Sequence, residues 1–230
     1  MRLTRSRSCV IVIVRYYTVI RLQGDTMRTL AILAQKGGCG KSTIARNLAV
    51  AALGNGLRSA IIDADPQETC LKWRARREAP APHVVGLDGR PLRDAAATLA
   101  ALGPDLIIID TPPHLRGAVS VAAELADAIL LPSQPTPEDL EALAGTIAML
   151  AGKPAAIVWN RASKGSCLSM ARGAATAFSV PLCPHPLADR VAYPYSSAEG
   201  LGVVEHDPNS KASAEIGAIW AWTKANLLKL

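Results

Sequence analysis

Residues 35–43 have the composition of a phosphate-binding turn. They read Gln-Lys-Gly-Gly-Cys-Gly-Lys-Ser-Thr, between the apolar run 30–34 and residues 44–53, whose apolar spacing is helical. A glycine-rich turn between a strand and a helix directs several backbone N–H groups and the positive end of the helix to one point. Because Lys41 and Ser42 follow the glycines, the turn predicts a site for a phosphorylated nucleotide and Mg²⁺.

Polar side chains follow three other predicted strands. Asp63 and Asp65 come at the end of one apolar run, Asp110 closes a second, and Asn160 closes a third. The carboxyl ends of parallel strands meet at one edge of a sheet, so we expect these side chains to surround the glycine turn. A single aspartate after a strand is more often a helix cap. Three such segments in register with a phosphate turn favour a nucleotide site instead.

The chemistry of a nucleoside triphosphate assigns roles to these residues. Magnesium and lysine must neutralise the phosphate charge before water can attack. We expect Ser42 to bind Mg²⁺ directly, Asp110 to hold it through water or hydrogen bonds, and Asp63 to support the metal shell. We expect Lys41 to reach the β- and γ-phosphates. Asp65 would orient or deprotonate the attacking water.

The turn differs from an ordinary P-loop in two residues. Gln35 stands where the common pattern has a glycine, and a second lysine, Lys36, stands at the mouth of the turn. This string resembles the deviant Walker A box of the ParA/MinD family of ATPases, which hydrolyse ATP to ADP and phosphate. The resemblance implies that Lys36 reaches across a nucleotide-sandwich dimer to the partner's phosphates. Arginine fingers supplied in this way typically change rates by about 10³–10⁵.

The same resemblance implies ATP and Mg²⁺ as cofactors and names the residues that contact the nucleotide. Asn160 matches the residue that hydrogen-bonds adenine in the family, and Pro184 opens a segment placed to close over the base. The nucleotide-contacting set is Lys36, Gly37, Gly38, Cys39, Gly40, Lys41, Ser42, Thr43, Asn160 and Pro184.

The elements that must position this site alternate along the chain. Strand-like runs are predicted at 30–34, 59–63, 83–85, 105–110, 127–132, 155–160 and 181–183, and helices at 44–53, 69–78, 92–102, 118–126, 137–150, 168–178 and 209–228. Alternation of this kind predicts an α/β fold with a doubly wound, mostly parallel sheet and helices on both faces. The resemblance to the ParA/MinD family implies that this fold is a P-loop NTPase fold of SIMIBI type.

Length and charge divide the 230 residues into two parts. Residues 27–230 are long enough for one ATPase domain. Residues 1–26 contain five arginines and one aspartate and so carry +4 of the formal net charge of +6. We interpret them as a basic extension, either a start placed too far upstream or a dispensable tail. An extra edge strand and a basic arm on DNA remain alternatives.

Cysteine usage indicates a reducing compartment. The five cysteines are odd in number and form no CxxC pair, so we expect free thiols in the cytoplasm. Cys183 and His185 are two potential metal ligands without a second pair, and we interpret them as loop residues. No apolar run approaches the roughly 18–20 residues that span a bilayer.

Further motifs resemble the small, ParF-like plasmid-partition branch of the family. They include the strings Asp-Ala-Asp-Pro-Gln at 63–67 and Asp-Thr-Pro-Pro at 110–113. This likeness implies ATP-driven dimerisation, DNA binding without sequence preference at the nucleoid, and hydrolysis stimulated by a ParB-type centromere-binding partner. The basic residues proposed to contact DNA phosphates are Arg161, Lys164, Arg172, Arg190 and Lys211, although a single such residue is more often a solvated surface charge.

Three other functions remain open from the sequence. A MinD-like membrane-cycling ATPase would use a C-terminal amphipathic helix, but the late part of 209–228 carries little positive charge, so packing on the sheet is favoured and no stable membrane association is expected. An ATP-dependent metabolic enzyme of the dethiobiotin-synthetase kind would need a polar substrate pocket that the sequence does not show. A nucleotide-gated scaffold would hold ATP with little turnover.

Overall fold

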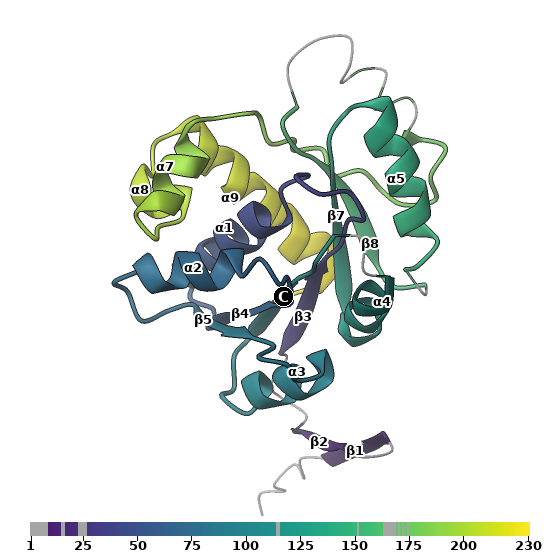
Figure 1. Cartoon of the computed structure of the whole chain (residues 1–230), viewed down its shortest axis with the longest axis vertical. Helices are drawn as coiled ribbons and strands as arrows, with labels where there is room; N and C mark the ends of the chain where they lie inside the picture. Colours follow the sequence, from purple (N-terminus) through teal and green to yellow (C-terminus); the bar gives the residue numbers. More distant parts are fainter. Residues whose placement is uncertain are drawn as a thin grey trace, which may run out of the picture.

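The body of the protein is one six-stranded parallel sheet with helices on both faces (Figure 1). The computed structural model describes residues 9–14, 17–22, 27–113, 116–150, 152–162, 169, 171, 173 and 175–230. The strands of the main sheet are β3 (Arg28–Ile32), β4 (Ser59–Asp63), β5 (His83–Gly86), β6 (Leu106–Asp110), β7 (Ala128–Ser133) and β8 (Ala155–Trp159). Their order is β5-β4-β6-β3-β7-β8, which confirms the predicted doubly wound fold.

Helices cover both faces of the sheet, and the central strands are therefore buried on both sides. Every residue of β4, β6, β7 and β8 is buried, as expected of continuous apolar runs in a parallel sheet. The helices are α1 (Lys41–Gly54), α2 (Thr69–Arg76), α3 (Leu92–Ala100), α4 (Arg116–Leu125), α5 (Pro137–Ile147), α7 (Ala192–Ala198), α8 (Val203–His206) and α9 (Lys211–Thr223), and α9 continues into the π-helical turn η1 (Lys224–Leu228).

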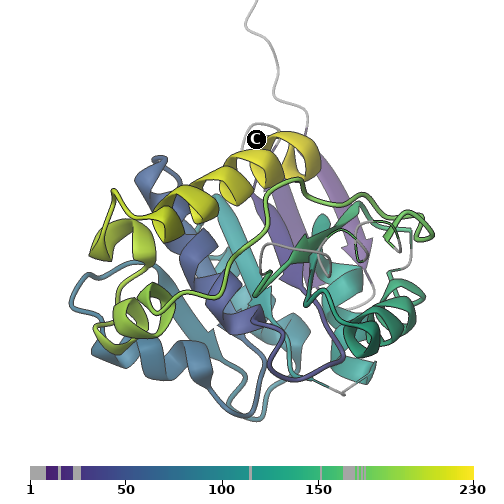
Figure 2. The ribbon, with the colours of Figure 1, turned by 90° about the horizontal axis from the view of Figure 1, so that it is seen from above.

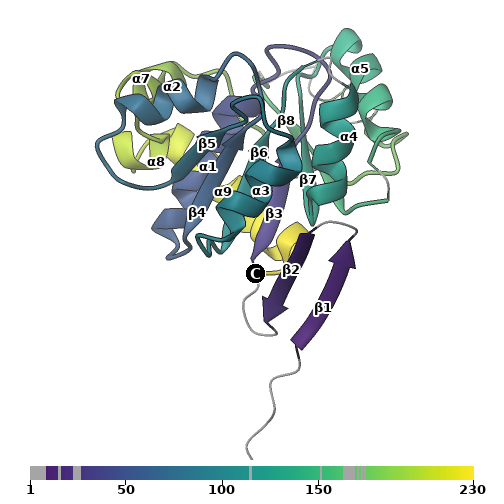
Figure 3. The same ribbon diagram turned by 60° about the horizontal axis from the view of Figure 1, so that its bottom comes forward.

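Two apolar cores separate these helices into layers. One core joins α1, α2, α9 and η1 to one face of the sheet, and the other joins α3, α4 and α5 to the opposite face. Figure 2 shows α9, in yellow, beside α1. Figures 1 and 3 show α1 and α9 on one side of the sheet and α3 and α4 on the other.

Some element boundaries differ from the sequence prediction. The predicted strand at 181–183 is a single bridge between Ile157 and Leu182. The predicted helix over 209–228 divides at Thr223 into α9 and η1, and α7 and α8 were not expected. The predicted helix over 168–178 falls partly outside the described residues.

The described part of the N-terminal extension forms a hairpin. β1 (Cys9–Val14) and β2 (Tyr17–Leu22) are antiparallel and pair only with each other among the described strands (Figure 3). The described strands therefore add no edge to the main sheet, and the alternative of an extra edge strand is wrong for them.

Strand register brings the acidic residues to the turn after β3. Asp110 pairs with Ile32 of β3 on one side and with Asp63 of β4 on the other. The Thr111 hydroxyl donates to the carbonyl of Ile32 at 2.8 Å and joins the ends of β6 and β3. Both carboxylates therefore start at the level where the chain leaves β3 for the glycine turn.

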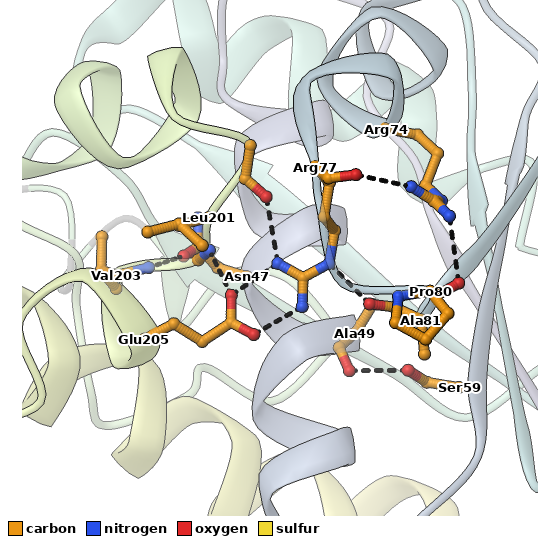
Figure 4. Close-up of polar contacts among 12 residues, drawn as sticks. Asn47, Ala49, Ser59, Arg74, Arg77, Pro80, Ala81, Leu201, Val203 and Glu205 are labelled. Atoms are coloured by element: carbon orange, nitrogen blue, oxygen red, sulfur yellow. Dashed lines mark hydrogen bonds and ion pairs between the residues drawn. The ribbon is translucent and has the colours of Figure 1, made fainter.

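A polar cluster, which we call the α2–α8 brace, joins α1 and α2 to the chain after α7 (Figure 4). It consists of Arg77, Gly200, Glu205 and Asn47. The Arg77 guanidinium donates to both oxygens of Glu205, at 2.7 and 2.5 Å, and to the Gly200 carbonyl at 3.0 Å. Asn47 of α1 accepts from the Val203 N–H at 2.8 Å. The brace holds the start of α8 against both helices.

Gly200 is the one member of the brace whose position no other amino acid could occupy without strain. Its φ is +71°, in the left-handed region, and a Cβ there would lie 2.6 Å from backbone atoms of Arg76 and Arg77. Glycine is therefore needed both for its backbone conformation and for the close approach of the two chains.

Candidate functional site

The glycine turn after β3 ends in an open helix N-terminus. Gly38 and Gly40 have φ values of +76° and +96°, which glycine adopts without steric cost. No side chain caps the first turn of α1, and no acidic residue lies in it. The free N–H groups and the helix dipole therefore favour an anion here.

Asn160 lies against this turn, as predicted. Its side-chain amide donates to the Cys39 carbonyl at 2.8 Å, and a Cβ on Gly40 would lie 2.1 Å from the amide nitrogen. The donor group of Asn160 is thus used by the turn. Its oxygen remains an acceptor, which is the group that the exocyclic amine of adenine requires.

The two lysines of the turn have different surroundings. Lys41 is buried, with its ammonium 3.5 Å from the Lys36 carbonyl. The Lys36 ammonium lies 2.5 Å from a carboxylate oxygen of Asp139 in the same chain, and this hydrogen bond raises the pKa of Lys36. Asp139 is almost fully buried and also accepts from the Thr136 hydroxyl at 2.7 Å. Lys36 therefore rests on α5, while its own side chain stays partly exposed.

Asp110 has the properties of a cation ligand. It is fully buried, one of its oxygens accepts from the Cys70 thiol at 3.2 Å, and the other has no partner among the described residues. Burial raises the pKa of Asp110 to about 6, and the nearby Ser42 side chain opposes that rise. An orphaned carboxylate oxygen beside the Ser42 hydroxyl fits Mg²⁺.

The described residues hold no group of three His, Cys, Asp or Glu side chains that could bind a metal alone. Mg²⁺ is usually held by one or two protein oxygens together with water and substrate phosphates. The nucleotide would thus complete the coordination that Asp110 and Ser42 begin.

Asp63 lies at the same edge but is engaged by the backbone. It accepts from the N–H groups of Cys70 and Leu71 in α2, at 2.8 and 3.0 Å, and from that of Asp65 at 3.2 Å. Burial raises its pKa, and these N–H groups lower it. Asp63 therefore caps α2, and its expected support of the metal would act by holding that helix.

Asp65 lies between Asp63 and the start of α2, in a partly exposed position. Its carboxylate accepts from the N–H of Gln67 at 2.9 Å. It stands at the mouth of the site rather than in its buried part, where a water molecule can reach it. Its expected role toward water stays a prediction.

A cavity of about 810 Å³ opens beside the glycine turn. Gly40, Thr43 and Asn160 line one part of it, and residues 188–191 line another. Pro184 is exposed and does not line the cavity, and its expected closure over the base stays a prediction.

The basic residues proposed for DNA contact differ in exposure and in whether they already pair with a carboxylate. Arg190 is bound to Glu215 by hydrogen bonds of 2.5–3.0 Å. Arg161 is exposed and lies 3.9 Å from Asp189. Lys211, the first residue of α9, is exposed. Lys164 and Arg172 lie outside the described residues.

The C-terminal helix is packed, as favoured from the sequence. The apolar residues Ile216, Ile219, Trp220, Leu227 and Leu228 are all buried, within the core that contains α1. None of the described helices is both long and apolar enough to cross a membrane.

Sequence reasoning missed two residues that shape the site. Asp139 was missed as a partner of Lys36, because the two residues are 103 positions apart along the chain. Arg46 follows Thr43 by one helical turn and faces the cavity. A charged residue at a buried position of α1 was the available signal for Arg46.

Comparison with known proteins agrees with this geometry. Residues 30–202 match the CobQ/CobB/MinD/ParA nucleotide binding domain. The maintenance of carboxysome distribution protein A of Halothiobacillus neapolitanus is 28% identical over 200 residues, which cover 81% of this chain and 91% of the relative. The chromosome partitioning protein ParA of Caulobacter vibrioides is 33% identical over 155 residues, which cover 49% of this chain and 58% of the relative.

Solved structures share the fold. The septum site-determining protein MinD of Pyrococcus horikoshii, in complex with Mg-ADP, superposes with a TM-score of 0.67 at 20% identity. The match covers 84% of this chain and 94% of that one. At this identity the likeness shows the six-stranded architecture rather than any shared partner.

Proposed function

Because the chain belongs to the CobQ/CobB/MinD/ParA nucleotide-binding family, we propose that it is an ATPase that partitions DNA through ATP-driven dimerisation. The observation that carries the proposal is the glycine turn, with an open helix N-terminus, a buried Lys41, and a buried Asp110 of which one oxygen has no partner among the described residues. These groups suit a triphosphate with Mg²⁺.

Each residue has one task in this ATPase. The turn and Lys41 bind the β- and γ-phosphates, and Ser42 with Asp110 holds Mg²⁺, which neutralises charge on the transferred phosphoryl group. Asp65 orients the attacking water. Lys36 leaves Asp139 and contacts the terminal phosphate of the partner protomer. Each protomer then stabilises the other's nucleotide, so hydrolysis removes the bridge between them.

The cargo of the cycle is DNA, bound through its phosphates by the dimer at the nucleoid. A ParB-type centromere-binding partner would stimulate hydrolysis and release the dimer. The names of relatives such as the Caulobacter partitioning protein support this assignment. Dimerisation doubles the number of cations facing DNA, so binding should require ATP and weaken steeply with salt.

A second candidate cargo is a protein assembly. It is favoured by the Halothiobacillus relative, whose name refers to carboxysome distribution and which this chain matches over 91% of its length. The ATPase cycle would be the same in both cases. Fluorescent labelling in cells separates them, because the tagged protein would follow either a replicon or a protein body.

Lys36→Ala tests the dimer on which both candidates depend. Wild type should pair with ATP but not with ADP or without nucleotide, as measured by size-exclusion chromatography with light scattering. We expect Lys36→Ala to bind ATP yet remain monomeric, with hydrolysis lowered by about 10³, the typical effect of a cation supplied in trans. Lys229→Ala, a change of an exposed lysine near the C-terminus, is the control. Unchanged pairing and hydrolysis in Lys36→Ala would contradict the proposal.

A further inference from the structure

Three cations of α1 and α2 face the cavity beside the glycine turn. Arg46 lies one helical turn after Thr43, on the same face of α1, and both residues line the cavity. Lys72 and Arg76 are four residues apart on α2 and line it from the other helix. We call these three residues the α1–α2 cationic wall.

Arg46 is a buried guanidinium with unfilled donors. It is 7% exposed, and its single hydrogen bond among the described residues, to the Thr69 carbonyl, is 3.5 Å long. A guanidinium has five N–H donors, and good N–H···O bonds are about 2.7–3.2 Å long. Arg46 forms no ion pair with any described residue. A buried charge without a partner is costly, so a ligand that supplies acceptors would be stabilising.

The groups around Arg46 act on its pKa in opposite directions. Burial lowers its pKa most, and the nearby Arg76 acts in the same direction. Cys70, Asp110 and Asp63 oppose this through space. The two carboxylates thus offset part of the effect of burial on Arg46, while Arg76, another residue that lines the cavity, repels its charge.

The other two members of the wall have neutral partners. The Lys72 ammonium donates to the Gln67 carbonyl at 2.7 Å, and Arg76 donates to the Ser197 carbonyl at 3.1 Å. These carbonyls orient the side chains and leave the charges in place. On the opposite side of the cavity, Arg161 and Arg190 each lie beside a carboxylate. Unpaired positive charge is therefore concentrated on α1 and α2.

The wall is separate from the phosphate turn. The cavity touches that turn through Gly40 and Thr43, whereas Lys36 and Lys41 do not line it. An anion on the wall would therefore lie beside the nucleotide and would not compete with its β- and γ-phosphates.

We propose that the α1–α2 cationic wall is a second anion site, which binds a phosphate-type oxyanion next to the nucleotide. Two arginines and a lysine line this one cavity, and guanidinium groups can bind a phosphate-type oxyanion through paired hydrogen bonds. The ligand is inorganic phosphate or the phosphoryl group of a small molecule, because Arg46 is too deeply buried for a duplex to reach. The site does not depend on the partition role.

Inorganic phosphate is the probe for this site. The full chain is first saturated with Mg²⁺ and an unhydrolysable ATP analogue, so that the phosphate turn is occupied, and phosphate is then titrated by calorimetry at constant ionic strength. We expect wild type to bind phosphate, and Arg46→Gln to weaken binding by about tenfold or more, since charge-assisted hydrogen bonds are lost. Arg93→Gln, which changes an exposed arginine paired with Glu124, is the matched control and should bind as wild type does.

Two further variants keep the result clear. Arg76→Gln changes an exposed side chain of the same wall, so it tests the site even if Arg46→Gln does not fold. Lys41→Ala, assayed without nucleotide, should retain phosphate binding on the wall. Equal phosphate affinity in wild type, Arg46→Gln and Arg76→Gln would overturn the proposal, as would no binding to wild type.

The last part of the experiment measures binding of a short DNA duplex to wild type and to the same variants. If duplex binding, and not phosphate binding, is lost in Arg46→Gln and Arg76→Gln, the small-ligand site is wrong and the wall contacts DNA. ATP-dependent pairing of the same variants is measured in parallel. Because pairing depends on Lys36, a failure of the anion site leaves the dimer intact, which separates the two proposals.

Discussion

The glycine-turn edge of the sheet and the α2–α8 brace are both buried and charged, but they differ in how their polar groups are satisfied. In the brace, all three guanidinium nitrogens of Arg77 donate to oxygen atoms of the chain, and Glu205 accepts from Arg77 and from the Gly202 N–H. At the turn, none of the described side chains caps the first turn of α1, and one oxygen of Asp110 has no partner among them. Arg46 nearby has a single long hydrogen bond within the same part of the chain.

This difference separates stability from binding. Satisfied buried groups contribute to the free energy of unfolding, and breaking one leaves its partner uncompensated. Unsatisfied buried groups cost stability until a ligand meets them, so they mark where a ligand belongs. Changes at the turn should therefore alter binding most, and changes in the brace should alter stability alone.

The largest effect is expected for Gly40→Ala. A Cβ there would meet the Asn160 amide at 2.1 Å, and φ is +96°, so the turn must distort. We expect ATP affinity to fall at least about 100-fold, because the N–H groups no longer converge on the phosphates. A fluorescent ATP analogue measures this.

Gly37→Ala is the matched control. It has the same substitution in the same turn, yet nothing lies within 4 Å of the added Cβ and no positive φ is required. We expect its affinity to stay within a few fold of wild type. Equal losses in the two variants would show that the turn tolerates no methyl group anywhere, and the steric argument at Gly40 would be wrong.

Arg77→Met should affect stability and not binding. The Arg77 side chain is 1% exposed and Glu205 is about one-third exposed, so the substitution removes the guanidinium donors of a partly buried carboxylate and of the Gly200 carbonyl. We expect a loss of roughly 2–4 kcal/mol in the free energy of unfolding, measured in urea, with ATP affinity per folded molecule unchanged.

Arg58→Met provides the comparison for that loss. Arg58 also pairs with a carboxylate, Asp105, but the arginine side chain is 67% exposed. Exposed ion pairs contribute about 0–1 kcal/mol. If Arg77→Met cost no more than Arg58→Met, the brace would not be the stabilising element that its hydrogen bonds indicate.

Asp110 predicts a pH dependence at the turn. Its pKa is raised from 3.8 to about 6 by burial, so between these values the folded state binds the proton more tightly than the unfolded state. The free energy of unfolding should therefore fall as pH rises through this window, with a total loss of roughly 2–3 kcal/mol complete above pH 6.

Asp110→Asn isolates this contribution. Without nucleotide, we expect the variant to melt several degrees above wild type at pH 8 and closer to it at pH 5. With Mg²⁺ and ATP the order should reverse at pH 8, because only the wild-type carboxylate binds the cation. A difference in melting temperature that does not change with pH would exclude the raised pKa.

The smallest effect is expected for Asp139→Asn. The amide keeps the hydrogen bond with Thr136 but loses the charge that holds Lys36. If Lys36 acts in trans, its release should lower the ATP concentration needed for pairing by about two- to fivefold, because the competing contact in cis is weaker. Unchanged pairing would show that Asp139 does not compete with the partner's phosphate.

Much of the fold could be predicted from residue pattern. The strands that hold Asp63 and Asp110 are continuous apolar runs, so their ends, and the meeting of both carboxylates with the glycine turn, followed from the parallel arrangement. The segment after β8 was harder, because Leu182 makes one bridge and α7 is short. Neither has enough repeats of an apolar period to be recognised.

The sequence by itself determined the phosphate chemistry, because glycines, Lys41 and Ser42 in one short string need only a strand before them and a helix after them. The tertiary structure decided what the other charges do. It placed Lys36 on Asp139, used Asp63 as a helix cap, and buried Arg46 at the wall of a cavity. The physical reason is that pairing and burial depend on contacts between residues far apart in the chain, which local spacing does not encode.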